Sequence, residues 1–301
     1  MSLLVVGSVA FDSIQTPHGE VEEVVGGSAT YFSIAASWFT PVRVVAVVGE
    51  DFSEEHFRIF RERPIDTQGI ERVPGKTFRW KGKYVGDMNE AQTLDTQLNV
   101  FAEFLPKIPP AFLDSDFLFL GNIDPALQLK VRQAFPALRA SALDTMNYWI
   151  KGMPAKLAKV LATVDILVIN ETEARMLSGH QNLKTAARHI QKLGPRTLVV
   201  KRGEYGATLF TQHSTFALPG LLLDEVHDPT GAGDTFAGGF MGYLAQTGDL
   251  SEPNLRRAAV YGSVMGSFAV EKFGLQRLLQ LAPGEIEARY RELKSLSQFD
   301  V

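Results

Sequence analysis

The stretch "DPTGAGDTFAGGF", residues 228–240, joins a glycine-rich turn directly to an apolar segment. Apolar residues recur at helical spacing from Phe236 through Phe240 to Leu244, so a helix is predicted to begin at this turn. Glycines at the start of a helix leave backbone N–H groups unpaired, with the positive end of the helix dipole behind them. The stretch therefore indicates either a plain turn, with Asp234 as a favourable first-turn carboxylate, or a binding site for an anion.

The position of Asp234 favours the anion site. A carboxylate beside an anion cradle makes chemical sense if it takes a proton from a hydroxyl that attacks a phosphoryl group held in the cradle. The sequence contains no G-x-x-x-x-G-K-[ST] pattern, which excludes a Walker A loop. A dinucleotide-binding turn is excluded as well, because Phe236 stands at its third glycine position and the turn lies late in the chain.

The composition is that of a globular protein without a nucleic-acid or membrane partner. The chain has 301 residues, enough for one large α/β domain, and a formal net charge of −4, so it offers no basic field. The absence of cysteine excludes disulfides and thiolate chemistry and fits a cytoplasmic location. The first residues, "MSLLVVGSVAFDSI", lack a basic region and predict a buried strand, and no apolar run is long enough to span a membrane.

Short apolar runs alternate with helical patterns along most of the chain. Strands are predicted at 3–8, 42–49, 117–121, 165–170 and 197–201. Nearly continuous apolar strands between helices predict a mostly parallel central sheet covered on both faces, in a three-layer α/β/α fold.

Two segments, at about 12–25 and 77–104, depart from this pattern. They alternate polar and apolar residues around polar turns and predict a small β-sheet lid beside the α/β body. Because no repeat or linker is visible, we expect residues 1–301 to form a single domain that includes this lid. A homodimer through the lid is a further expectation.

The stretch 228–240 closely resembles the C-terminal motif of the ribokinase/PfkB carbohydrate kinases. The resemblance implies a ribokinase-like fold and transfer of the γ-phosphoryl group of ATP, with Mg²⁺, to an alcohol of a small polyol. It implies that Asp234 is the general base and that the backbone amides of Gly231, Ala232 and Gly233 form the anion hole. Asp228 and Thr230 match positions that bind a monovalent cation such as K⁺ in some members.

"NETEA", residues 170–174, follows an apolar strand and allows two interpretations. Asn170 and Glu173 have the spacing of a helix capping box. They also match the N-x-x-E motif of the resembled family, which implies that they bind Mg²⁺ and phosphate, the glutamate partly through water. Both interpretations can hold together.

The segment "VVKRGEYGATLF", residues 199–210, predicts a hairpin whose turn holds Gly203 and Gly206. It resembles the nucleotide-side motif of the family, in which the turn contacts ATP, and Lys201 could reach a phosphate. Residues 267–274, ending in Gly274, match the adenine-side helix and turn more loosely, and the end of a core helix explains them equally well.

The resemblance also implies acceptor-binding residues near the N-terminus. Asp12 matches an aspartate that binds substrate hydroxyls, although it could equally be a strand-end aspartate in a turn, and Gly26 and Gly27 match a double glycine that enters a helix. The chain departs from the family where asparagines are usual, because Tyr31 and Ala10 stand at those positions.

An asparagine offers furanose hydroxyls both a donor and an acceptor, which these residues do not. We therefore expect ribose to be a weak acceptor, and an acceptor with a broader or more apolar face, such as a nucleoside or a cyclitol, to be preferred. Tyr31 is expected to pack on that face. Asn122, in "LGNIDP", is expected at a strand end facing the acceptor, and Arg79, Asn89 and Asp95 of the lid are expected to select it.

Two alternatives remain open at this level. One is a vitamin kinase of the pyridoxal or hydroxymethylpyrimidine type, against which the intact "GAGD" and the lack of cysteine argue. The other is a non-catalytic sugar-sensing protein, which would not need to keep both Asp234 and the N-x-x-E pair.

Overall fold

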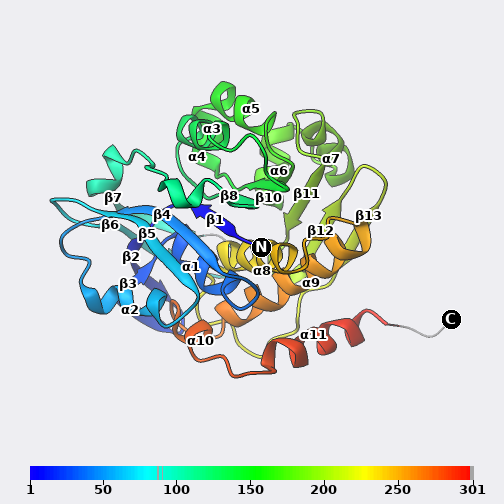
Figure 1. The fold of residues 1–301 in the computed structure, drawn as a ribbon. Coiled ribbons are helices and arrows are strands. Elements are labelled where there is room, and N and C mark those ends of the chain that lie inside the picture. The colour runs from blue at the N-terminus through cyan, green and yellow to red at the C-terminus, as the bar shows by residue number, and fades with distance from the viewer. Residues whose placement is uncertain (87, 90, 299–301) are drawn as a thin grey trace.

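The computed structural model describes residues 1–86, 88–89 and 91–298, and its centre is a nine-stranded sheet (Figure 1). The strand order is β13-β12-β11-β10-β9-β8-β1-β4-β5. All neighbouring pairs from β11 to β5 are parallel, whereas β12 and β13 pair antiparallel at one edge. The strands are β1 (Leu3–Val6), β4 (Val42–Val48), β5 (Ile65–Arg72), β8 (Phe117–Leu120), β9 (Ala140–Leu143), β10 (Ile166–Asn170), β11 (Thr197–Lys201), β12 (Ala207–Phe210) and β13 (Thr215–Leu218).

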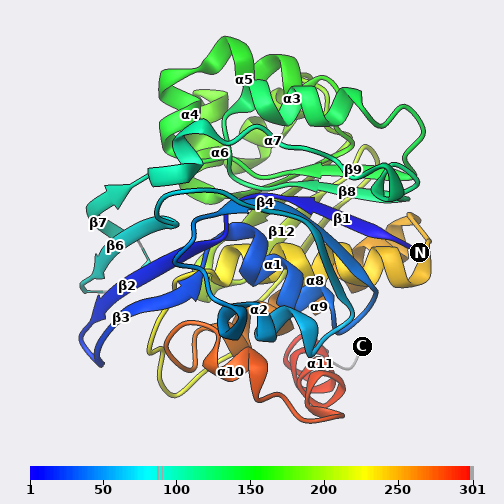
Figure 2. The same cartoon turned by 60° about the vertical axis from the view of Figure 1, so that its left-hand side comes forward.

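Helices cover both faces of this sheet, and Figure 2 shows the two layers on opposite sides of it. Successive residues of one strand enter different cores: Leu3 and Val5 of β1 face one core, and Leu4 and Val6 face the other. This explains why the strands are apolar without alternation. The first core is covered mainly by α1 (Ser28–Ala36), α2 (Glu54–Arg61), α8 (Ala232–Thr247), α9 (Glu252–Ala269), α10 (Gln276–Leu279) and α11 (Glu285–Leu296), and the second by α3 (Pro125–Gln133), α4 (Asn147–Gly152), α5 (Pro154–Leu161), α6 (Glu171–Ser178) and α7 (Leu183–Gln191).

The two hairpins predicted for the lid pair with each other. Strands β2 (Ala10–Thr16), β3 (Gly19–Gly26), β6 (Phe78–Tyr84) and β7 (Ala91–Gln97) form a four-stranded sheet in the order β3-β2-β6-β7, with β2 and β6 parallel. The sheet lies to one side of the body (Figure 2). The predicted three-layer α/β/α fold with a β lid is therefore confirmed. That the whole chain is one domain, and that the exposed lid forms a homodimer, stay predictions.

Within the described ranges, no helix combines the length and the hydrophobicity that a membrane crossing requires.

Glycines of α8 hold the start of this helix in place by allowing close contact with its neighbours. A Cβ added at Gly238 would lie 2.3 Å from the backbone oxygen of Phe32 in α1. A Cβ at Gly239, on the side of α9, would lie 2.8 Å from the Met265 side chain. The stretch "AGGF", residues 237–240, thus lets α1, α8 and α9 pack tightly behind the glycine-rich turn.

We expect Gly238→Ala to lower the free energy of unfolding by about 1–3 kcal/mol, because the added methyl group must push the backbone of α1 away. Gly266→Ala in α9 is the matched control, because its Cβ would meet nothing closer than 3.4 Å. The control should leave stability unchanged or raise it by up to about 1 kcal/mol. Denaturant unfolding of both variants measures the difference. Equal stabilities would show that close packing of α1 on α8 does not hold the turn.

Candidate functional site

The candidate site lies where the carboxyl ends of three parallel strands meet the start of α8. Asp144 directly follows β9, Asn170 ends β10 and Lys201 ends β11, where Asn170 and Lys201 are register partners. In parallel α/β sheets the carboxyl ends of the strands are the usual place for ligands. The strand order thus brings together polar residues that are far apart in the sequence.

The glycine-rich turn forms the N-terminus of α8. Gly231 is the N-cap and has a left-handed backbone with a φ of 73°. A Cβ there would lie 2.4 Å from ring atoms of Tyr31, so glycine is required for its conformation and for space. Of the amides predicted to form the anion hole, that of Ala232 donates to the Pro229 carbonyl at 3.2 Å, which closes the turn.

Lys201 lies against the same turn. A Cβ at Gly233 would lie 2.7 Å from the Lys201 Nζ, so the missing side chain makes room for the ammonium group. The nearby carboxylates of Asp144, Glu173 and Asp234 raise the lysine pKa and outweigh the opposing effect of burial. Lys201 is therefore charged, and its charge adds to the positive end of the α8 dipole.

Three carboxyl groups surround Lys201. Burial raises the pKa of Asp234 to about 7, with a further contribution from Asp144 and an opposing one from Lys201. Burial and Asp144 likewise raise the pKa of Glu173 to about 7. The pKa of Asp144 is itself raised by burial. Asp234 and Glu173 therefore exchange protons near neutral pH, and an additional cation would favour the ionised forms of all three groups.

Sequence reasoning missed Asp144. The preceding strand, "ASAL", is four residues long and carries small side chains, so it gave no clear strand signal. The only available signal was an acidic residue after a short apolar run in "ASALDT".

Asn170 and Glu173 form the predicted capping box. The Asn170 Oδ1 accepts a hydrogen bond from the Glu173 N–H at 2.8 Å, and the Glu173 Oε2 accepts one from the Asn170 N–H at 2.8 Å. Glu173 is also close enough to Lys201, Asp144 and Asp234 to interact with them electrostatically. The cap therefore aims the glutamate into the site.

Asp228 connects two loops of the site. Its Oδ1 accepts a hydrogen bond from the Thr230 N–H and its Oδ2 accepts one from the Gly274 N–H, both at 2.8 Å. The Thr230 hydroxyl donates to that of Tyr84 in the lid at 3.2 Å. The two residues predicted to bind a monovalent cation thus fix the glycine-rich turn 228–233, the predicted anion turn, against Gly274 and the lid, and cation binding by them stays a prediction.

Asp12 lies in β2, at the start of the lid, on the side expected to bind the acceptor. Its carboxyl group is buried, and burial together with Asp228 and Asp234 raises its pKa to about 7, although the Gly27 amide donates to it. A Cβ at Gly26 would lie 1.9 Å from the Asp12 Oδ2. The double glycine therefore admits the carboxylate, and Asp12 and Asp234 face the same region.

Tyr31 is buried against the glycine-rich turn, and Asn122 is bonded to another side chain. Tyr31 is 1% exposed, its ring lies against Gly231, and its hydroxyl has no hydrogen-bond partner among the described residues. The ring supports the anion turn from within the core and presents no open face, so its expected packing on an acceptor has no support in this conformation. The Asn122 Oδ1 accepts from the Trp149 Nε1 at 2.8 Å, beside the site.

The turn between β11 and β12 contains Gly203 and Gly206, with φ values of 56° and 84°. A Cβ at Gly203 would lie 2.5 Å from the Asn89 Oδ1. Asn89, which was expected to select the acceptor, thus contacts the turn expected to bind the nucleotide. Of the other two lid residues, Arg79 pairs with Glu23 and Asp51 at 2.6 and 2.8 Å, and Asp95 is exposed on β7.

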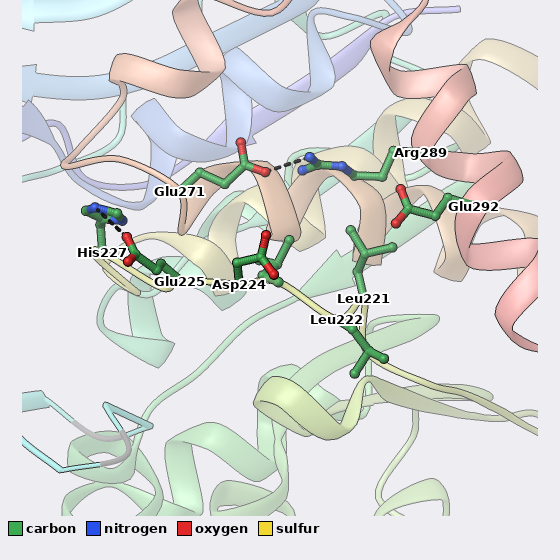
Figure 3. A pocket seen from close by; sticks show the side chains of 9 residues that line it. Leu221, Leu222, Asp224, Glu225, His227, Glu271, Arg289 and Glu292 are labelled. Carbon is green, nitrogen blue, oxygen red and sulfur yellow. Dashed lines mark hydrogen bonds and ion pairs between the residues drawn. The ribbon is translucent and has the colours of Figure 1, made fainter.

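A cavity of about 370 Å³ lies beside the loop that precedes Asp228 (Figure 3). The stretch 221–227, which leads to Asp228, forms one wall, and Glu271 and Arg289 lie on the other side. Glu271 pairs with Arg289 at 2.6 Å. The cavity thus lies between the loop before the anion turn on one side and Glu271 and α11 on the other.

Known proteins resemble this chain in sequence. The chain is 29% identical over 258 residues to a cytidine kinase of Thermococcus kodakarensis, which covers 84% of this chain and 91% of that protein. It is 33% identical over 288 residues to a deoxyribokinase of Salmonella typhi, which covers 87% of this chain and 92% of that protein.

A solved structure shares the fold at low sequence identity. A ribokinase II candidate from E. coli, solved in complex with ATP and Mg²⁺, superposes with a TM-score of 0.78 at 19% identity and covers 97% of this chain and 99% of that one. The family model described as "pfkB family carbohydrate kinase" matches residues 2–281. With that match across nearly the whole chain, this phosphotransferase belongs to the pfkB family of carbohydrate kinases.

Proposed function

We propose that this kinase transfers the γ-phosphoryl group of ATP to a hydroxyl of a nucleoside or another small polyol, with Asp234 as the general base. The observation that carries the proposal is the position of Asp234. Its carboxyl group stands in the first turn of α8, beside the Lys201 ammonium and within electrostatic reach of Asp12. A hydroxyl between Asp12 and Asp234 would be deprotonated where the attacked phosphoryl group is bound.

The raised pKa of Asp234 suits this role. A general base works best when its pKa lies near the working pH, and burial brings that of Asp234 to about 7. The carboxylate can then accept a proton from the hydroxyl as the oxygen attacks phosphorus. The neighbouring Lys201 keeps a fraction of Asp234 ionised despite the nearby Asp144.

The transferring phosphoryl group would be bound by the turn 231–233 and by Lys201. The helix N-terminus and the ammonium present positive charge to the same space, where negative charge develops on the phosphoryl oxygens. Both are fixed before the reaction, because Gly231 packs on Tyr31 and Lys201 lies against Gly233. Little reorganisation is then needed in the transition state.

The donor set fits Mg²⁺. Glu173 and Asp144 are carboxylates whose pKa values burial raises, and Asn170 holds Glu173 in place. Mg²⁺ prefers such oxygen ligands and usually keeps several waters, so Glu173 would hold it largely through water, with Asp144 on the same side. When bound, the ion neutralises charge on the phosphates of ATP.

The acceptor class follows from the acceptor side of the pocket. Asp12 supplies a carboxylate for a hydroxyl pair, but Ala10 and the buried Tyr31 supply none of the amide groups that would pair the remaining hydroxyls of a free sugar. The cytidine kinase and the deoxyribokinase among the relatives act, by their names, on a nucleoside and a sugar. We infer that a nucleoside is preferred over free ribose.

We expect Asp234→Asn to lower kcat by roughly 10²–10⁴-fold, because asparagine keeps the shape but cannot accept a proton. ATP affinity should stay close to that of the unchanged chain, since the turn and Lys201 remain. Single-turnover kinetics and equilibrium ATP binding measure the two effects, and thermal unfolding serves as the control for folding. Turnover near the original rate in a folded variant would exclude Asp234 as the base.

Glu173→Gln separates a metal-binding role from a structural one. We expect the variant to need at least several-fold more Mg²⁺ for half-maximal rate, because the amide is a weaker metal ligand than the carboxylate.

Asn182→Ala is the matched control for Glu173→Gln. The Asn182 Oδ1 caps α7 by accepting from the Thr185 N–H at 3.0 Å, away from the carboxyl cluster. This control should lose about 0.5–2 kcal/mol of stability with an unchanged Mg²⁺ response. If Glu173→Gln behaves like the control, Glu173 is a helix cap only.

For the acceptor, we expect kcat/KM for cytidine or another nucleoside to exceed that for ribose by at least tenfold. The reason is that a pocket without amide partners leaves buried hydroxyls of a free sugar unpaired, at a cost of about 1–3 kcal/mol each. Steady-state rates on a panel of ribose, deoxyribose, nucleosides and inositol measure this preference. Ribose as the best substrate would contradict it without affecting the kinase assignment.

A further inference from the structure

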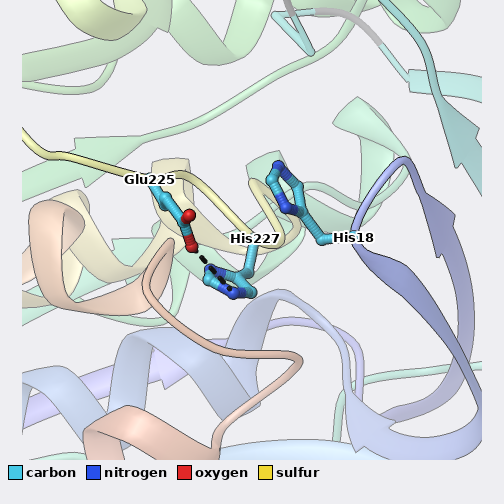
Figure 4. Close-up of side chains that lie close together, drawn as sticks. All are labelled: His18, Glu225 and His227. Carbon is cyan, nitrogen blue, oxygen red and sulfur yellow. Dashed lines mark ion pairs between the residues drawn. The ribbon is translucent and has the colours of Figure 1, made fainter.

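A cluster of metal-ligating side chains joins the lid to the loop that precedes the anion turn. His18 lies in the turn between β2 and β3, and Glu225 and His227 lie just before Asp228 (Figure 4). One ligand atom from each of the three side chains lies within 4.8 Å of the other two. None of these residues has a role in the proposed phosphoryl transfer.

The side chains already converge. The His227 Nε2 lies 3.5 Å from the Glu225 Oε2, and the ring centroids of His18 and His227 are 4.8 Å apart. The His227 Nδ1 is buried and has no hydrogen-bond partner within the part of the chain that the structure describes. The His227 ring is therefore held in place more by packing against its neighbours than by hydrogen bonds of its own nitrogen atoms.

The donor set is one that zinc uses. Two imidazoles and one carboxylate, with a fourth position for water, form a common tetrahedral site for Zn²⁺. In a tetrahedral site, metal–ligand distances of about 2.0–2.2 Å place ligand atoms about 3.3–3.6 Å apart. The His227–Glu225 pair has this spacing, and His18 and Glu225 are exposed and can rotate to complete it.

We propose that His18, Glu225 and His227 bind a Zn²⁺-class ion that pins the lid hairpin to the loop leading into the anion turn. Two further contacts show that both segments lie against the same part of the body. The His227 N–H donates to the Val270 carbonyl at 2.8 Å, which fixes His227 to the body. On the lid, a Cβ at Gly19 would lie 3.6 Å from the Phe273 ring, so the hairpin already touches the same region.

Binding at this site would restrain the lid. Asp12 belongs to the same hairpin as His18, so a hairpin fixed at its turn keeps Asp12 over the acceptor region. Lids of this kind must open to release product, and opening often limits turnover. An occupied site is therefore inhibitory, a consequence that depends on the proposed function, whereas the binding itself does not.

The binding test uses the full chain without ATP, because ATP itself binds Zn²⁺. Calorimetric titration with Zn²⁺ should give one tight site, and Co²⁺ should give the visible absorption bands of a tetrahedral complex. His18→Ala and Glu225→Gln should each weaken binding by at least about 10–100-fold.

The control for binding is His189→Ala. His180 and His189 form another pair of imidazoles, with ring centroids 4.0 Å apart, away from the lid. This variant should bind Zn²⁺ as the unchanged chain does. Binding that survives His18→Ala, or that is lost in His189→Ala, overturns the proposed site.

The lid test uses hydrogen exchange of the backbone around His18, with and without Zn²⁺. The ion should slow exchange there at least several-fold in the unchanged chain and have no effect in His18→Ala. Binding without such protection would overturn the restraint of the lid.

A rate comparison tests the functional consequence. At a fixed, saturating concentration of Mg²⁺ and ATP and without Zn²⁺, the turnover rate of His18→Ala should equal that of the unchanged chain. With added Zn²⁺ the unchanged chain should slow more than His18→Ala, because loss of Mg²⁺-ATP to Zn²⁺-ATP affects both equally. Equal slowing of the two would contradict inhibition through the lid, whereas inactivity of both without Zn²⁺ would instead contradict the kinase proposal.

Discussion

The burial of Lys201 among three carboxyl groups is the interaction on which the site depends. An isolated ammonium in a half-buried position would lose hydration without compensation, and a group of buried carboxylates without a cation would repel one another. Asp144, Glu173 and Asp234 each counter the effect of burial on Lys201. The strand order makes this arrangement possible, because β9, β10 and β11 are adjacent: Asp144 follows β9, Glu173 lies in the first turn of α6 after β10, and Lys201 ends β11.

The buried carboxyl groups of the site make the folded chain less stable at neutral pH than at acidic pH. The pKa values of Asp234, Glu173 and Asp12 are raised to about 7, so the folded chain holds these protons more tightly than the unfolded chain does. Their contribution to stability is therefore fully present below the unfolded pKa near 4 and is lost as the pH rises through about 7. The close packing of α1 on Gly238 and the amides around Asp228 are among the interactions that offset this cost.

The sequence predicted most strands of the parallel sheet, the lid hairpins and the glycine-rich turn at the start of α8, because each carries a local signal. A buried parallel strand is continuously apolar, and a helix that starts at a glycine-rich turn leaves both a composition and a spacing to recognise. Asp144 lacked such a signal. The burial of Tyr31 could not be predicted, because its ring packs against Gly231, which lies far along the chain. The convergence of His18 and His227 is likewise a product of tertiary structure alone.

The lid contacts the body on the side expected to bind nucleotide as well as beside the region proposed for the acceptor. Tyr84 accepts a hydrogen bond from Thr230 in the anion turn, and Asn89 lies against Gly203. The hairpin turn at His18 adds a further contact, at His227. Because these body segments flank the region proposed for ATP, a bound nucleotide and a bound acceptor would both alter the surface on which the lid closes. If both substrates bind there as proposed, lid closure would depend on the presence of both, which is what a kinase needs in order to exclude water as a competing acceptor.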